Sequence, residues 1–66
     1  MRVECKPSDR PGSQGIFKYI SEAGDTAAGV WDEAIKELRE EFPDDRVIFL
    51  GPLESDDVLV LEVVEA

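Results

Sequence analysis

Several residue types that usually carry chemistry are missing or scarce in this 66-residue chain. It contains neither histidine nor asparagine, and only one cysteine, Cys5. Without histidine it lacks the commonest general base and a favoured metal ligand, and without asparagine it lacks any N-glycosylation acceptor. A lone cysteine cannot form an internal disulfide and suits a reducing compartment. We therefore expect a protein that is not an enzyme and that binds no metal and no cofactor.

Long hydrophobic runs are also absent. No apolar stretch approaches the roughly 20 residues that span a bilayer, and the first residues lack the basic-then-apolar pattern of a signal peptide. We expect a cytoplasmic protein without membrane contact. Hydrophobic residues make up 42% of the chain, as in ordinary globular proteins, which predicts one folded domain over residues 1–66.

Positive charge is scarce and unevenly placed. Seven bases face sixteen acids, which leaves a net charge of −9. Residues 1–20 hold four bases and two acids, a balance of +2, whereas residues 21–66 hold three bases and fourteen acids, a balance of −11. Such a charge repels nucleic acid and anionic membranes and attracts basic surfaces. We expect a basic protein partner and no direct binding of nucleic acid.

The first third of the chain reads as two strands around a loop. Residues 1–6 and 16–21 have extended patterns, and the segment 7–15 between them is rich in Pro, Ser, Asp and Gly. The two strands can pair as a hairpin. Cys5 lies on the apolar side of the first strand, where it is expected to fill the core.

A helix is predicted from Ala27 to Phe42. Asp25 and Thr26 supply candidate N-caps, and Pro43 ends the helix because proline disfavours helical geometry at the residue before it. The apolar residues recur at helical spacing. The stripe expected to face the core consists of Ala27, Ala28, Trp31, Ala34, Ile35, Leu38 and Phe42.

The last third reads as a second antiparallel hairpin. Residues 46–50 and 58–64 are β-branched and apolar, and turn-forming residues separate them. The order is therefore strand, strand, helix, strand, strand. This predicts an α+β fold in which one amphipathic helix packs on one face of an antiparallel sheet of three or four strands.

Both faces of the last two strands are apolar. One face would carry Val47, Phe49, Leu59, Leu61 and Val63, and the other Ile48, Leu50, Val58, Val60 and Val64. A single helix covers only one face, and a face in contact with water should alternate with polar residues. The second apolar face predicts a homodimer, a partner surface, or a cover formed by residues 7–15.

The polar side of the predicted helix divides into two flanks. One holds Asp32, Lys36 and Arg39, and Asp32 and Lys36 form a pair of opposite charge four residues apart. The other flank holds only acids, is expected to face away from the core, and is extended by two aspartates past the helix end. We call this set the acidic ridge: Glu33, Glu37, Glu40, Glu41, Asp44 and Asp45.

The acidic ridge opposes helix stability. Glu37 has a like-charged neighbour four residues away on each side, Glu33 and Glu41, and such pairs are destabilising. Acids near a helix C-terminus also oppose the macrodipole. The helical rise places the three residues about 6 Å apart, close to the spacing of phosphates along one nucleic-acid strand. The ridge can therefore imitate a phosphate backbone, or it can simply keep a small protein soluble.

In size and charge the chain resembles the small acidic inhibitors of phages and mobile elements, notably anti-CRISPR and anti-restriction proteins that mimic nucleic acid. The resemblance rests on the length, the single domain, and the acidic stretches at 37–41, 44–45 and 54–57. It implies an inhibitor that occupies a basic nucleic-acid-binding site, for example the channel of a CRISPR effector. The expected contacts are the acidic ridge and a second acidic patch of Glu54, Asp56 and Asp57.

Two other readings stay open. The chain can be an interaction module or homodimer that uses the apolar sheet face containing Ile48, Val58 and Val60, with the acids providing solubility. It can also be a domain of a halophile, whose acids suit concentrated salt.

Overall fold

The computed structural model describes residues 1–50 and 57–66, apart from the side chain of Ala27. It confirms the α+β class and the predicted order of elements. These are β1 (Arg2–Lys6), β2 (Ser13–Ile20), α1 (Ala27–Glu41), β3 (Arg46–Phe49) and β4 (Val58–Val64). Of the predicted second acidic patch, Glu54 and Asp56 lie outside the described residues, and Asp57 is exposed.

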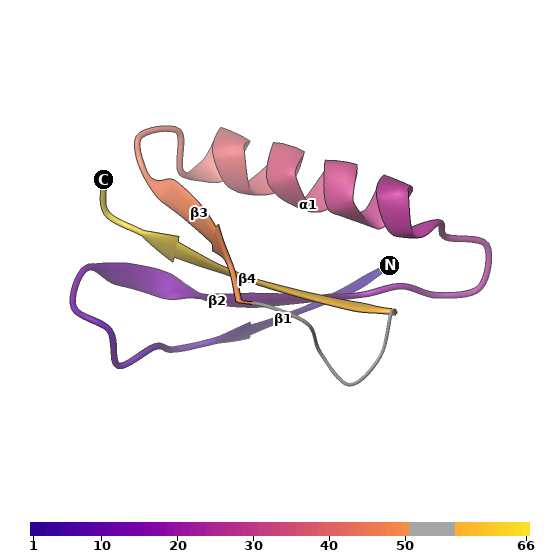
Figure 1. Cartoon of the computed structure of the whole chain (residues 1–66), viewed down its shortest axis with the longest axis horizontal. Helices are drawn as coiled ribbons and strands as arrows, with labels where there is room; N and C mark the ends of the chain where they lie inside the picture. Colours follow the sequence, from indigo (N-terminus) through magenta and orange to yellow (C-terminus); the bar gives the residue numbers. More distant parts are fainter. Residues whose placement is uncertain (51–56) are drawn as a thin grey trace.

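The four strands form one antiparallel sheet in the order β1-β2-β4-β3. Helix α1 lies over one face of this sheet (Figure 1). Each predicted hairpin is present, and the two are joined through the pairing of β2 with β4. This pairing puts β2 and β4 in the centre and leaves β1 and β3 as the edges.

Strand β2 begins earlier than predicted, at Ser13 rather than Ile16. Its first residues pair with the end of β4 through an irregularity between Ser13 and Gly15. Gly15 has a φ of 133°, and a Cβ there would lie 3.2 Å from the carbonyl oxygen of Lys6. Gly15, one of the glycines that suggested a loop, thus serves a bulge within the strand.

The helix has the predicted start. The hydroxyl of Thr26 accepts a hydrogen bond from the backbone N–H of Gly29 at 3.0 Å, which satisfies one of the free amides of the first turn. At the other end the N–H of Phe42 donates to the carbonyl of Leu38 at 2.8 Å, immediately before Pro43.

The buried line of α1 is rotated from the predicted stripe. Val30, which the prediction omitted, is buried together with Ala34 and Leu38. Ala28 and Trp31, which the prediction included, are exposed. Ile35 and Phe42 of the predicted stripe also pack against the core, but they are only half-buried, so the fully buried line is centred on Val30, Ala34 and Leu38. The buried core consists of Tyr19, Val30, Ala34, Leu38, Leu61 and Val63.

The loop between β1 and β2 covers part of the sheet face opposite α1, which we call the open face. Residues 10–13 form a turn in which the N–H of Ser13 donates to the carbonyl of Arg10 at 3.2 Å. Pro11 and Gly12 occupy its central positions, and the φ of 79° at Gly12 is that of a type II turn. Side chains of this loop contact Glu62 of β4. Of the three explanations for the second apolar face, the loop cover is present.

Candidate functional site

The helical members of the acidic ridge all lie on the surface. Glu33, Glu37, Glu40 and Glu41 are exposed, as is Asp44, whereas Asp45 is half-buried. Glu33, Glu37 and Glu41 follow one another at intervals of four residues along α1. At the helical rise this spacing is about 6 Å between successive residues. The structure therefore presents the predicted row of carboxylates to the solvent.

The row runs along the flank of α1 that faces β1 and β2. Burial raises the pKa of Tyr19, on β2, to about 12, and the charges of Glu37, Cys5 and Glu41 add to the rise. The two glutamates thus lie near the buried phenol. Both glutamates are exposed, as predicted, but they lie closer to the buried line of α1 than the predicted stripe implied. The difference arises because Val30, absent from the predicted stripe, is buried and shifts the centre of the buried line towards the row.

No ridge carboxylate forms an ion pair with any of the described residues. Among the described residues, ion pairs join the amino group of Met1 to Glu22 and Asp25, Arg2 to Glu4, and Arg10 to Glu62. The pair expected between Asp32 and Lys36 does not form either. In addition, α1 has no acid in its first turn, where an acid would be favourable. The negative charge of the helix is therefore neither paired nor placed to favour the helix.

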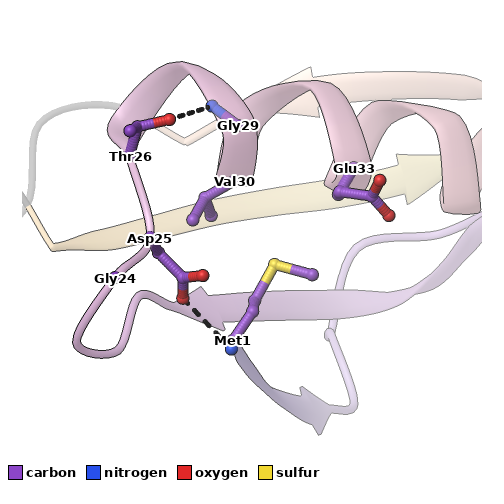
Figure 2. Close-up of a pocket in the computed structure, with 7 residues that line it drawn as sticks. All are labelled: Met1, Gly24, Asp25, Thr26, Gly29, Val30 and Glu33. Atoms are coloured by element: carbon purple, nitrogen blue, oxygen red, sulfur yellow. Dashed lines mark hydrogen bonds and ion pairs between the residues drawn. The ribbon is translucent and has the colours of Figure 1, made fainter.

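A small pocket of about 270 Å³ lies at the start of the row (Figure 2). It is lined by Met1, Gly24, Asp25, Thr26, Gly29, Val30 and Glu33. The amino group of Met1 lies 2.9 Å from Glu22 Oε1 and 3.1 Å from Asp25 Oδ2. These contacts raise the pKa of the amino group. The pKa of Asp25 is lowered, chiefly by a hydrogen bond from the backbone of Glu22. The amino group of Met1 and the carboxylate of Asp25 satisfy each other, and Glu33 is left without an ion pair among the described residues, so we assign no reaction to the pocket.

Glu62 is a residue whose role the sequence analysis missed. It is 1% exposed and lies on the open face of β4. Its Oε2 accepts hydrogen bonds from Ser8 Oγ at 2.5 Å and Ser13 Oγ at 2.8 Å, and Arg10 Nε lies 3.0 Å from Oε1. The two hydroxyls and the guanidinium lower the pKa of the carboxyl against the opposing effect of burial. The carboxylate is ionised and fully engaged, so its role is to hold the loop on the sheet.

A signal for Glu62 was present in the sequence. It is the only acid among the seven residues of β4, Val58–Val64, and an acid in a buried apolar strand requires polar partners. Its partners come from positions 49 to 54 residues away, which the strand pattern alone does not reveal.

An exposed aromatic pair lies on the other flank of α1. Trp31 is 42% exposed and Phe49 of β3 is 49% exposed. Their ring centroids are 5.7 Å apart in an edge-to-face arrangement. The sequence analysis assigned Trp31 to the core, and the structure instead places it at the border of the helix towards β3. Cys5 was also expected in the core, and it is exposed.

The described residues contain no group of three or more Cys, Asp or Glu side chains arranged to hold a metal ion. Within the same residues, no helix is long and apolar enough to cross a membrane. Comparison with known proteins adds no assignment, because no protein-family model matches the chain and no curated protein or solved structure is significantly similar to it.

Proposed function

We propose that this protein is a non-enzymatic inhibitor whose acidic ridge mimics nucleic-acid phosphates. It occupies the basic nucleic-acid-binding site of a defence complex such as a CRISPR effector, in the cytoplasm of the cell that contains the complex. The protein would be carried by a phage or another mobile element.

The observation that carries the proposal is the row Glu33, Glu37 and Glu41. These side chains are exposed, evenly spaced, and without an ion pair among the described residues. A basic groove that binds successive phosphates can pair with such a row through the same lysines and arginines. Because these carboxylates form no ion pair among the described residues, they can pair with a basic surface without breaking one.

The positions of the basic residues also indicate that the contact surface is on the helix side of the molecule. Arg2 and Lys6 of β1, Lys18 of β2 and Arg46 of β3 alternate with residues that face the core, so they belong to the open face. The protein is thus acidic on the helix side and partly basic on the opposite side. Such a polarised molecule approaches a positively charged groove with its helix first.

The alternative of a homodimer through the open face receives less support. Arg10, Ser8 and Ser13 cover Glu62 at its centre. Two copies that met through this face would also bring like-charged Arg2, Lys6 and Lys18 together. A halophilic domain stays an alternative, and it predicts unfolding in low salt.

The test uses immobilised protein and an extract from cells that contain a CRISPR system. The ridge variant carries Glu33→Gln, Glu37→Gln and Glu41→Gln. The matched control carries Asp9→Asn, Asp32→Asn and Glu65→Gln, which removes the same charge from exposed positions outside the ridge. If each contact is worth about 0.5–1 kcal/mol, the ridge variant binds about 10- to 100-fold more weakly.

We expect the wild type and the control to capture a nucleic-acid-binding complex that moderate salt or an excess of DNA duplex releases. The ridge variant should not retain it. The proposal fails if the ridge variant captures the same proteins as the control, or if neither DNA nor RNA displaces them.

A further inference from the structure

The two edges of the sheet differ in their protection against pairing with another strand. In β1 three of the five residues, Arg2, Glu4 and Lys6, are charged, which is a common way to keep an edge from pairing. In β3, by contrast, only Arg46 is charged, and the three residues that follow it are apolar. β3 is therefore the less protected edge of the described sheet.

Hydrogen bonding shows which backbone groups β3 presents outwards. The N–H of Leu50 donates to the carbonyl of Val60 at 3.1 Å, so Leu50 faces β4. Because antiparallel residues alternate between facing the partner strand and facing away, Val47 and Phe49 direct their N–H and C=O groups away from β4. These groups lie on the open side of the edge, where another strand can pair with them.

The aromatic pair lies directly beside this edge. Phe49 is both an edge residue and a contact of Trp31, and Leu50 next to it is 37% exposed. Three of the four large hydrophobic side chains that are exposed in the described residues thus lie on or next to β3. Exposed tryptophan beside apolar neighbours is typical of the centre of a protein interface.

The charges on this side favour a second copy of the chain as the partner. The flank of α1 that carries Trp31 also holds Asp32 and Arg39, and Asp45 and Arg46 lie at the start of β3. This is a mixture of signs, unlike the row Glu33, Glu37 and Glu41 on the opposite flank; Asp45 is the one ridge member that lies beside β3. In a two-fold interface a contact of one residue with a second is repeated with the two copies exchanged, so an acid that meets a base away from the axis forms that pair twice. Two such edges can meet without bringing together the rows Glu33, Glu37 and Glu41 of the two copies.

We infer that two copies of this protein associate through their β3 edges, with Trp31 and Phe49 of each copy packed across the contact. The two sheets become one continuous sheet of eight strands, and the row Glu33, Glu37 and Glu41 of each copy lies at its outer sides. The inference is independent of what the ridge binds.

The test is sedimentation equilibrium of the purified protein between about 10 µM and about 1 mM, a range that suits a small, weak interface. The apparent mass should rise from 7.3 kDa towards twice that value. Trp31→Ala and Phe49→Lys should each weaken association at least about tenfold. Val3→Lys is the matched control, since Val3 is 41% exposed on the opposite edge, and it should leave association unchanged.

Two further measurements separate this contact from others. Hydrogen exchange at the amides of Val47 and Phe49 should slow at high protein concentration, whereas the amides of β1 should not change. Added salt should not dissolve the dimer, because the contact is mainly apolar and salt screens the net repulsion between two acidic chains along with the pairs of opposite charge. A protein that stays monomeric at about 1 mM overturns the inference. An assembly that salt dissolves also overturns the inference, because it would indicate that the acidic ridge of one copy contacts the open face of another. An assembly that Val3→Lys disrupts overturns it as well.

Discussion

Carboxylates occupy two opposite environments in this protein, on the two sides of one thin sheet. On the helix side, Glu33, Glu37 and Glu41 are exposed, close to one another and without ion pairs among the described residues. On the open face, Glu62 is buried and receives two hydroxyls and a guanidinium. The same chemical group therefore opposes folding at one place and stabilises it at the other. The stability of the fold therefore does not account for the unpaired row.

Removal of the Glu62 carboxylate should have the largest effect. Glu62→Ala leaves Ser8, Ser13 and Arg10 without their common acceptor, and unpaired polar groups at a buried site are costly. We expect the free energy of unfolding to fall more than for any ridge substitution, and the loop between β1 and β2 to become sensitive to proteases. Urea denaturation and limited proteolysis measure this. If Glu62→Ala left the free energy of unfolding unchanged or raised it, as is expected for the ridge variants, the contrast between the two environments would be lost.

A fall in pH should also destabilise the fold through Glu62. The pKa of Glu62 is below its ordinary value of 4.5 in the folded protein. Its stabilising contribution is therefore complete above about pH 4.5 and is lost as the pH falls through the lower pKa of the folded state. The difference in unfolding free energy between the wild type and Glu62→Gln should narrow between about pH 5 and about pH 3. A constant difference over that range would contradict the assignment.

Neutralisation of the ridge should have a smaller effect of opposite sign. Glu33→Gln, Glu37→Gln and Glu41→Gln remove two like-charge pairs and should stabilise the fold by about 0.5 kcal/mol in total at low ionic strength. The gain should nearly vanish in about 1 M salt, where the screening length is about 3 Å. Urea curves at both salt concentrations test this. A destabilised variant would show that the row supports the fold.

The smallest expected change is in the titration of Tyr19. Its pKa of about 12 is due first to burial and then to Glu37, Cys5 and Glu41. Glu37→Gln with Glu41→Gln should lower this pKa, but it should stay above the ordinary value of 10.0. Because a raised pKa favours the protonated phenol in the folded state, stability should decline as the pH rises above about 10. Absorbance at alkaline pH follows the phenolate, and an unchanged pKa would place the ridge farther from Tyr19.

Much of the fold follows from local patterns. The limits of α1 depend on Thr26 and Pro43, and the limits of β4 match the apolar run from Val58 to Val64. The start of β2 was misjudged because Gly15 serves a bulge rather than a loop. The exposure of the ridge was predictable, since the acids share one side of the helix. The rotation that brings Glu37 and Glu41 near Tyr19 was not, because it depends on how α1 sits on the sheet.

By itself, the sequence determined the order of the elements, the amphipathic helix and the excess of acid, because these depend on residue type and on spacings of a few positions. Only the tertiary structure decided that β2 pairs with β4, that Glu62 meets Ser8, Arg10 and Ser13, and that Trp31 is exposed beside Phe49. Those contacts join residues far apart along the chain. Their formation depends on the packing of the whole sheet, which no local pattern specifies.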